Sequence, residues 1–242
     1  MVEDTIASHS GELEHPKVVI ASNGSVIARY HTDPEFRSSI DNADVIDADG
    51  MPLILVSRLI CAQPLVERVA TTDFVHDAAD AASRSGVRFY LLGARPGVAD
   101  EAAARLRRDH PGLQIVGTRH GYSIEENLEE ICAEIVALKT DIVWLGLGSP
   151  YQENLAIRLR PLLPGVTWIR TCGGLFDHIS GSVPRAPRWM QRLGLEWLHR
   201  AMKEPKRLGW RYIKTNPVAM FHLLTKTGDV EAPSSNMTVP SA

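Results

Sequence analysis

The sequence lacks any run of about eighteen or more apolar residues, so no segment is expected to cross a membrane as a helix. Its first fifteen residues are acidic and contain no apolar stretch, which excludes a secretory signal peptide there. Cysteine is scarce as well: Cys61, Cys132 and Cys172 are odd in number and lie far apart. They predict reduced thiols in a cytoplasmic protein, and neither they nor the nine histidines have metal-site spacing.

The composition is that of a folded protein, because 44% of the 242 residues are hydrophobic and 23% are charged. That composition excludes disorder of the whole chain, and the length suffices for a sizeable core. The formal net charge of -3 is unevenly distributed. Ten Lys or Arg and two Asp or Glu lie between Arg185 and Lys226, a local charge of +8, so the remainder carries -11. Such a basic segment indicates an anionic partner: nucleic acid, phospholipid headgroups or a diphosphate.

Short apolar runs alternate with segments of helical periodicity along most of the chain. The predicted strands are residues 18–22, 45–47, 87–92, 113–117, 141–147 and 166–170. The predicted helices are residues 52–60, 72–85, 96–109, 124–138 and 151–159. Several strands are continuous apolar runs, as expected for strands that are buried on both faces of a sheet. The pattern predicts an α/β protein with a Rossmann-like parallel sheet, flanked by helices and joined by right-handed crossovers.

The pattern changes after about residue 180, where prolines punctuate the helical stretches. Three tryptophans lie there among the arginines: Trp189, Trp197 and Trp210. We expect residues 1–15 to form a flexible N-terminal tail and residues 16–183 to form the α/β core. Residues 184–228 are expected to form a basic helical appendage that binds a membrane surface or a diphosphate, and residues 229–242 a disordered tail.

An Asp-x-Asp pair, Asp47 and Asp49, stands at the end of the second predicted strand. Two carboxylates in this arrangement resemble a metal–diphosphate clamp. A single aspartate at the carboxyl end of a parallel strand is also well placed as a general base. The third alternative is structural, a turn in which Asp49 hydrogen-bonds its own backbone before Gly50. Without further context, the residues favour the structural turn over the two functional alternatives.

Glycine-rich turns stand where three further strands end, around Gly93, Gly148 and the pair Gly173–Gly174. Such turns let backbone N–H groups and a helix dipole face a phosphate, although tight strand-to-helix connections use the same residues. Gln152 and Glu153 lie in the first turn of the helix that follows Gly148. Glu153 suits the helix dipole, whereas Gln152 has less structural reason to be there and is the better functional candidate.

Three arginines of the expected appendage, Arg200, Arg207 and Arg211, are seven and four residues apart. This spacing places them on one face of a helix if Pro205 only kinks it. Aligned arginines suit a diphosphate through bidentate hydrogen bonds, and the interleaved Trp, Leu and Met residues suit a lipid interface. A solvated basic helix face is the alternative.

Read along the chain, these motifs resemble the WecG/TagA/CpsF family of bacterial glycosyltransferases. The resemblance extends from about residue 17 to about residue 215. The matching pieces, in order, are Asn23, Asp49-Gly50, Glu67-Arg68-Val69, Gly93-Ala94-Arg95-Pro96-Gly97, His120-Gly121-Tyr122, Gly146 to Glu153, Gly173 to Asp177, Arg185-Ala186-Pro187, Glu196-Trp197 and Glu204-Pro205-Lys206-Arg207.

The resemblance implies an inverting transferase that moves a sugar from a UDP-sugar to a polyprenyl-diphosphate-linked saccharide. Such enzymes serve exopolysaccharide, capsule, teichoic acid and common antigen assembly. The expected location is the cytoplasm, peripheral on the anionic inner face of the plasma membrane. The family works without a catalytic metal, so no cofactor is expected and the Asp-x-Asp pattern is read as accidental. No nucleic-acid partner is expected, and the sequence leaves monomer and homo-oligomer both open.

The resemblance also assigns roles to individual residues. The catalytic base corresponds to Asp49, with Asn23 and Gln152 near the same site. The residues expected to bind substrate are Arg68, Gly93, Gly148, Gln152, Glu153, Gly173, Gly174, Arg200, Arg207 and Arg211. Four positions depart from the family pattern. Ala21 replaces a frequent Thr, Thr71 a usual Gly and Trp210 a frequent Arg. The fourth, Cys172, replaces a common Val, which favours a packing role over a nucleophile.

Two other functions compete with this interpretation. One is a nucleotide-binding α/β enzyme such as a dehydrogenase or epimerase, against which the missing GxGxxG motif and the basic helical segment count. The other is a nucleic-acid-binding module that uses the basic segment. Its binding to DNA or RNA would weaken steeply with salt, but the overall charge of -3 and the tryptophan pattern count against it.

Overall fold

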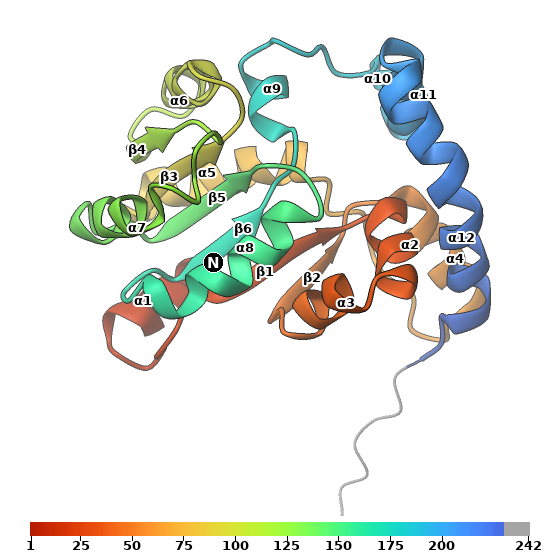
Figure 1. Ribbon diagram of the computed structural model, residues 1–242, viewed down its shortest axis with the longest axis horizontal. Helices are drawn as coiled ribbons and strands as arrows, with labels where there is room; N and C mark the ends of the chain where they lie inside the picture. The colour runs from red at the N-terminus through yellow and green to blue at the C-terminus, as the bar shows by residue number, and fades with distance from the viewer. Residues whose placement is uncertain (230–242) are drawn as a thin grey trace, which may run out of the picture.

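Six strands form one parallel sheet in the computed structural model, in the order β2-β1-β6-β5-β3-β4 (Figure 1). The strands are β1 (Lys17–Ser22), β2 (Val45–Ala48), β3 (Arg88–Gly93), β4 (Gln114–Arg119), β5 (Ile142–Gly146) and β6 (Trp168–Thr171). The structure describes residues 1–229 except for the side chains of Arg192 and Arg207. Residues 230–242 of the expected C-terminal tail therefore lie outside the described residues. The predicted α/β class with a parallel sheet is confirmed.

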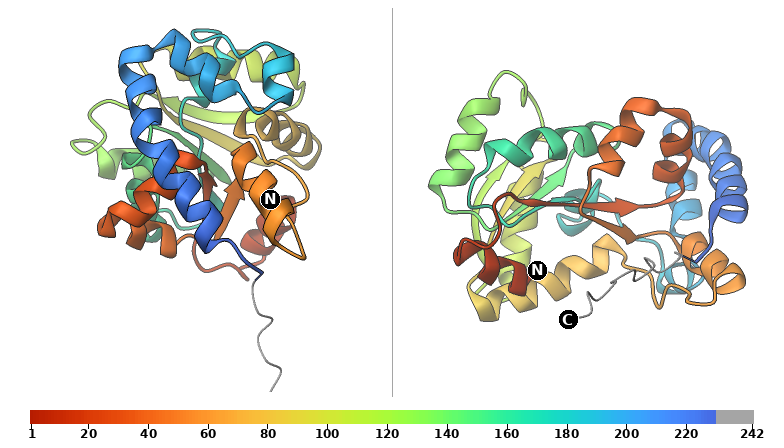
Figure 2. Two further views of the ribbon diagram at one scale, coloured as in Figure 1. Left: turned by 90° about the vertical axis from the view of Figure 1, so that its right-hand side faces the viewer. Right: turned by 90° about the horizontal axis from the view of Figure 1, so that it is seen from below.

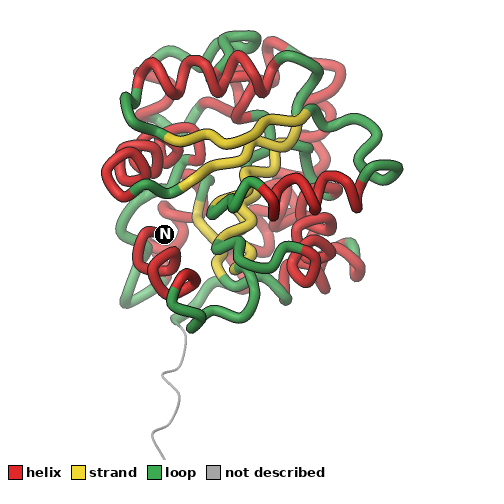
Figure 3. The backbone as a smooth tube through the Cα atoms, turned by 90° about the vertical axis from the view of Figure 1, so that its left-hand side faces the viewer, coloured by secondary structure: helices red, strands yellow, loops and turns green. Residues whose placement is uncertain are grey.

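Helices cover both faces of this sheet (Figure 3). One face carries α5 (Thr71–Ser85), α6 (Val98–Asp109) and α9 (Leu175–Ile179). The other face carries α2 (Gly24–Thr32), α3 (Pro34–Asp41), α7 (Leu128–Ala137) and α8 (Tyr151–Leu159). Successive residues of β3 alternate between the two cores, with Phe89 and Leu91 in one and Tyr90 and Leu92 in the other. This burial on both faces is why the strands are continuous apolar runs.

All the predicted strands and helices occur, and α8 occupies the predicted residues 151–159. The largest shift is in α7, which begins at Leu128 instead of residue 124. Ser123 has a left-handed φ of 56° just before that segment, which a regular helix does not tolerate. Two helices that the periodicity did not reveal, α2 and α3, connect β1 to β2.

The first fifteen residues do not form the flexible tail that the sequence predicted, because Val2–His9 form helix α1. Asp4 in α1 accepts hydrogen bonds from Lys17 and from the indole N–H of Trp168. His9 Nε2 lies 2.8 Å from Oδ1 of the buried Asp141. These polar contacts attach α1 to the sheet, and a short acidic segment gives no apolar pattern by which to predict them.

The C-terminal part of the chain lies against the edge at which the strands end (Figure 1). It contains α10 (Arg188–Arg192), α11 (Glu196–Lys203), a π-helical turn (Pro205–Gly209) and α12 (Trp210–Lys226). We call residues 184–228 the appendage. Helix α12 lies along α2 and also meets α4 (Met51–Ile60) (Figure 2). Within residues 1–229, no helix is long and apolar enough to span a bilayer.

Candidate active site

Two adjoining cavities lie at the carboxyl edge of the sheet. The first, of about 580 Å³, is lined mainly by the loops after β3, β5 and β6, and we call it the strand-end cavity. The second, of about 320 Å³, is also lined by α4, α11 and α12, and we call it the appendage cavity. The residues that line both are Asn23, Ser25, Asp49, Thr71, Cys172, Gly174, His178, Arg200 and Arg211. This edge is where parallel α/β proteins bind ligands.

Asp49 follows β2 directly and lies where the two cavities meet. Its Oδ1 accepts a hydrogen bond from the Thr71 backbone N–H (3.4 Å), and its Oδ2 accepts one from the Thr71 hydroxyl (3.1 Å). Burial raises the pKa of Asp49 to about 6, in opposition to the Arg68 charge and the Thr71 hydrogen bonds, which lower it. Asp49 is therefore ionised at neutral pH and is a stronger base than an exposed aspartate.

Asn23 directly follows β1, which pairs with β2, and its loop contacts the loop of Asp49. A Cβ added to Gly50 would lie 3.5 Å from the Asn23 Cα. The Asn23 side-chain oxygen caps α2 by accepting hydrogen bonds from the backbone N–H groups of Ser25 (3.0 Å) and Val26 (3.4 Å). The structure thus brings Asn23 and Asp49 together, with Asn23 also holding the start of α2.

Gln152 connects two glycine turns. Its side-chain oxygen accepts hydrogen bonds from the backbone N–H groups of Gly148 (3.2 Å) and Gly173 (3.0 Å). Its side-chain nitrogen donates to Oε1 of Glu153 (2.8 Å). The polar atoms of Gln152 therefore fix the two loops that line the strand-end cavity, and the geometry gives this residue a positioning role.

Glu153 is fully buried in the first turn of α8 and lines the strand-end cavity. Burial raises the pKa of its carboxyl above the ordinary value, and the hydrogen bond from Gln152 lowers it. Among the described side chains, its Oε2 is one of the buried oxygens without a hydrogen-bond partner. Complementing the dipole of α8 does not require a carboxyl to be buried with one unsatisfied oxygen, so the dipole alone does not explain Glu153.

Arg68 lines the appendage cavity and donates a hydrogen bond to Oε2 of Glu196 in α11 (2.7 Å). Glu196 also contacts Arg185 (3.4 Å), which in turn contacts Asp73 in α5 (2.6 Å). These four residues, which we call the latch, attach α11 to the core. Arg68 therefore has a carboxylate partner next to Asp49, in addition to any contact with a ligand.

Two of the three predicted appendage arginines reach the site. Arg200 and Arg211 line both cavities. A Cβ added to Gly174 would lie 3.5 Å from a terminal nitrogen of Arg200, so this guanidinium lies against the Gly174 turn. Arg207 lies in the π-helical turn, and its side chain is outside the described part of the structure.

Gly93 is placed apart from the other predicted site residues and, in the described structure, lines neither cavity. Its φ is +146°, and an added Cβ would collide with the backbone of Gly146 in the neighbouring strand. Close packing of the ends of β3 and β5 therefore explains this glycine. Its successors Ala94 and Arg95 line the strand-end cavity instead.

Asp47 and Asp49 have different partners: Asp47 pairs with Arg170, whereas Asp49 accepts hydrogen bonds from Thr71. The Asp47 carboxylate forms an ion pair with the guanidinium of Arg170, which is buried beneath the Phe74 and Trp144 rings. Across residues 1–229 no group of three or more His, Cys, Asp or Glu residues is arranged to hold a metal ion. The two aspartates thus have different environments.

Cys172 and His178 lie beside Asp49 in both cavities. Burial raises the pKa of the Cys172 thiol far above its ordinary value, so the thiol stays protonated and is not a nucleophile at neutral pH. His178 Nδ1 contacts the backbone carbonyl of Val183 (3.1 Å), and burial lowers its pKa. His178 is thus a hydrogen-bonding loop residue.

Three lining residues were missed as candidates from the sequence. Thr71 holds the Asp49 carboxylate, and its departure from the family glycine was the signal available. Glu196 holds Arg68, and its place in the Glu196-Trp197 motif was a signal. Asn216 lines the appendage cavity from within α12, where asparagine is a poor helix former.

Comparison with known proteins agrees with this geometry. The model of a protein family described as "Glycosyl transferase WecG/TagA/CpsF family" matches residues 2–230. A protein of Bacillus spizizenii (strain ATCC 23059 / NRRL B-14472 / W23) is 33% identical over 199 residues, which cover 82% of this chain and 75% of that protein. That relative is named N-acetylglucosaminyldiphosphoundecaprenol N-acetyl-beta-D-mannosaminyltransferase. The chain therefore belongs to the WecG/TagA/CpsF family of glycosyltransferases.

Proposed function

We propose that this enzyme transfers a sugar, with inversion, from a UDP-sugar to a polyprenyl-diphosphate-linked saccharide during synthesis of a cell-surface polysaccharide. The observation that carries the proposal is the place of Asp49. Its carboxylate, of pKa about 6, lies where a polar cavity meets a second cavity that is partly apolar. The name of the Bacillus relative, which includes a sugar-diphosphate-lipid acceptor, supports the same reaction class.

In this reaction Asp49 accepts the proton of an acceptor hydroxyl while the hydroxyl oxygen forms a bond to the anomeric carbon of the donor. The bond between that carbon and the diphosphate oxygen breaks, and UDP departs with the electron pair. Attack from the face opposite the leaving group inverts the configuration. Backbone N–H groups at the glycine turns and the guanidinium groups of Arg200 and Arg211 are available to stabilise the charge on UDP.

The strand-end cavity suits the nucleotide donor. It is the larger of the two, and Gly148, Gly173 and Gly174 bring backbone close to its interior. Three cations, Arg95, Arg200 and Arg211, line it as well. Gln152 holds two of these glycine turns in place, so its role is to position the loops that bind the donor.

The appendage cavity suits the acceptor because its lining combines cationic and apolar side chains. The cations are Arg68, Arg200 and Arg211. The apolar side chains come from α4 and α12: Met51, Pro52, Ala219, Met220 and Leu223. A lipid-linked diphosphate sugar has the matching parts, anionic phosphates and a hydrocarbon chain.

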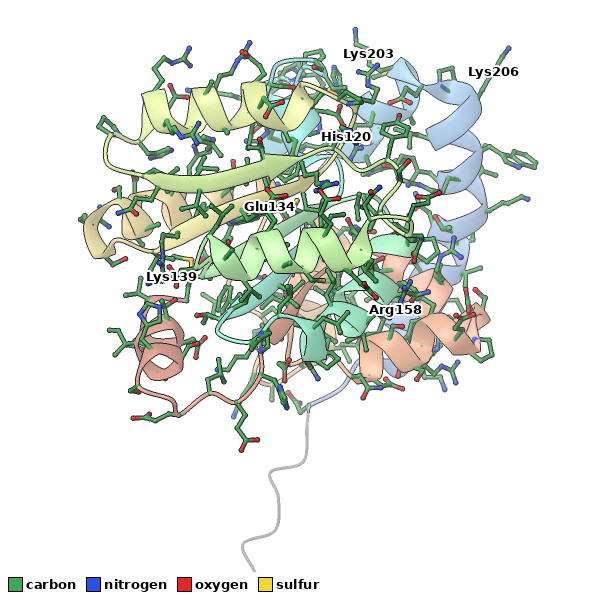
Figure 4. The ribbon with its side chains drawn as sticks, turned by 60° about the vertical axis from the view of Figure 1, so that its left-hand side comes forward. His120, Glu134, Lys139, Arg158, Lys203 and Lys206 are labelled. Atoms are coloured by element: carbon green, nitrogen blue, oxygen red, sulfur yellow. The ribbon has the colours of Figure 1, made fainter. Side chains whose placement is uncertain are left out.

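The outer face of α4 and the appendage supports peripheral attachment to an anionic membrane. Large apolar side chains are exposed along these helices: Leu55, Leu59, Trp189, Leu193, Met202, Trp210, Ile213, Met220, Phe221 and Leu224. Lys203 and Lys206 point away from the sheet at one end of this face (Figure 4). Apolar side chains that enter the headgroup region and cations that attract anionic lipids together hold a protein on a bilayer.

We propose that the reaction needs no metal cofactor. The support is that Asp47, the second member of the Asp-x-Asp pattern, is paired with Arg170. Addition of EDTA should leave the initial rate unchanged. A loss of rate that Mg²⁺ or Mn²⁺ restores would contradict this proposal and bring Asp47 back as a candidate ligand.

The function is tested with the full-length protein, a panel of UDP-sugars that includes UDP-N-acetylmannosamine, and a polyprenyl-diphosphate-linked N-acetylglucosamine acceptor. UDP release that requires both donor and acceptor is expected. The Asp49→Asn variant should bind the donor normally yet lose about 10²- to 10⁴-fold in kcat, because an amide cannot accept the proton. Near-normal turnover by this variant would remove Asp49 as the base, and no release with any UDP-sugar would overturn the function.

A further inference from the structure

A third recess, of about 220 Å³, is lined mainly by residues of α2 and α12. These two helices lie side by side (Figure 2), and we call the recess between them the seam recess. Asp49 and Asn23, which mark the proposed active site, are not among the described residues that line it. It adjoins the strand-end cavity through three shared residues: Ser25, Ser149 and Arg211. The recess is thus a neighbour of the active site with its own walls.

The lining of this seam recess is cationic and rich in hydroxyl groups. Three cations, Arg29, Arg211 and Lys214, come from the two helices that form the seam. The hydroxyl groups are those of Ser25, Thr32, Ser149 and Thr215. No carboxylate occurs among its described lining residues. The Arg29 side chain has an acidic neighbour one helical turn away, Asp33, at 3.4 Å.

Two polar atoms on the α12 side of the recess have no partner within the described structure. Arg211 Nε is a buried donor without an acceptor, and the buried hydroxyl of Thr215 also lacks a hydrogen-bond partner. Buried polar groups are nearly always satisfied, so unpaired ones require an explanation. Neither atom is exposed to solvent, so a hydrogen-bond acceptor bound in the recess would satisfy them once the side chains that cover them shift.

Helical spacing places the rim of the recess next to the exposed apolar face. Arg211, Lys214, Thr215 and Val218 follow one another at intervals that put them on a single flank of α12. Lys214 is exposed, and its ammonium lies 5.0 Å from the centre of the exposed Trp210 ring. The cations of the recess therefore adjoin the side chains that the proposed function places at the membrane.

We propose that the seam recess binds a phosphate group, and that this group is the headgroup phosphate of an anionic phospholipid. Arginine, lysine and hydroxyl donors without a carboxylate are the chemistry that recognises phosphate. The adjoining apolar face argues for a lipid source, and this part of the inference rests on the proposed membrane function. Such a site would fix how α12, which carries Arg211, is oriented relative to the membrane.

The test compares two double variants that remove the same charge. Arg29→Gln with Lys214→Gln removes two recess cations, while Lys203→Gln with Lys206→Gln removes two exposed appendage cations outside the recess. Dihexanoylphosphatidylglycerol, as separate molecules below its micelle concentration, and inorganic phosphate are titrated calorimetrically into each protein. The recess variant should bind the short-chain lipid about tenfold more weakly than the control variant, because charge-assisted hydrogen bonds are lost.

Equal binding by the two double variants, or no binding of either probe to the unsubstituted protein, would overturn the proposed phosphate site in the seam recess. Binding of inorganic phosphate without binding of the lipid, with the same dependence on Arg29 and Lys214, would keep the phosphate site and overturn the lipid source. Failure of the proposed glycosyltransferase function is a separate outcome. It would be seen as no UDP release with any donor and a detergent-solubilised acceptor.

A neutral substitution gives a second readout that does not depend on long-range charge. Thr215→Val keeps the shape of the side chain and removes only the unpaired hydroxyl. It should weaken binding of the short-chain lipid several-fold, while the thermal stability of the ligand-free protein stays equal or rises. Unchanged lipid binding by this variant would contradict a direct role of Thr215 in the recess.

Discussion

At the scale of the residue, the environment of Asp49 determines how the enzyme should respond to pH. A general base acts when it is deprotonated, and the pKa of Asp49 is raised to about 6. We expect kcat/KM to fall about tenfold per pH unit below pH 6 and to be level above it, as far as the base controls the rate. A steady-state pH profile measures this acid limb.

The charge of Arg68 offers a check on that assignment, because it lowers the pKa of Asp49. Arg68→Gln should therefore move the acid limb of the kcat/KM profile to higher pH, in addition to any loss of rate. Arg188→Gln, at an exposed position of the appendage, is the matched control and should leave the limb in place. A limb that stays at the same pH in Arg68→Gln would argue against Asp49 as the titrating group.

The same burial should make the Asp49 carboxylate costly for stability. Because the folded-state pKa is above the unfolded value, the cost of ionisation is full above about pH 6 and disappears below about pH 4. Asp49→Asn should thus raise the free energy of unfolding by roughly 1–3 kcal/mol at pH 7.5 and give little gain at pH 4. Denaturant unfolding at the two pH values measures the difference, and a variant less stable at pH 7.5 would contradict it.

At the scale of the element, the latch determines where α11 lies relative to the core. Arg185 contacts both Asp73 of α5 and Glu196 of α11, so Arg185→Gln leaves two carboxylates without this partner. We expect the KM for the lipid-linked acceptor to rise several-fold and cleavage by protease near residues 180–195 to become faster. Donor binding should change less, because Arg185 lines neither cavity in the described structure. Arg188→Gln again serves as the control, and equal effects of the two substitutions would refute a specific role of the latch.

At the scale of the whole molecule, we expect the appendage to be separable from the core. Neither of the two hydrophobic cores, as far as the structure describes them, includes a residue beyond Ile179. A chain that ends before Arg185 should therefore keep its sheet and unfold cooperatively, as circular dichroism can measure. It should lose transfer to the lipid-linked acceptor, because Arg200, Arg211 and the α12 wall of the appendage cavity are absent. Turnover as fast as that of the full chain would contradict the role of the appendage.

The charge of the appendage also makes a prediction about salt. Its local charge of +8 should hold the full-length protein on anionic vesicles at low ionic strength. The Debye length falls to about 3 Å at 1 M salt, so much of this attraction should be lost there. Co-sedimentation with vesicles over a salt series measures the effect. Vesicle binding that is insensitive to salt would favour attachment through the apolar side chains alone.

Periodicity and turn chemistry by themselves determined the class of fold and the edge at which the site lies. Continuous apolar strands at Val18–Ser22 and Ile142–Leu145 predict a parallel sheet, and parallel strands bring all their carboxyl ends to one edge. The position of Asp49 at a strand end followed from the same local pattern. Such features depend on neighbours within a few residues, which is why they can be read along the chain.

Only the tertiary structure decided which distant residues meet. Gln152 connects Gly148 to Gly173, Arg68 pairs with Glu196, and Thr71 holds Asp49. Gly93 proved to be required by the neighbouring strand, and the seam recess exists because α12 lies along α2. The hydrogen bonds from Gly173 to Gln152, from Thr71 to Asp49 and from Arg68 to Glu196 join residues that are 21, 22 and 128 positions apart. They depend on strand order and helix packing, which no local pattern encodes.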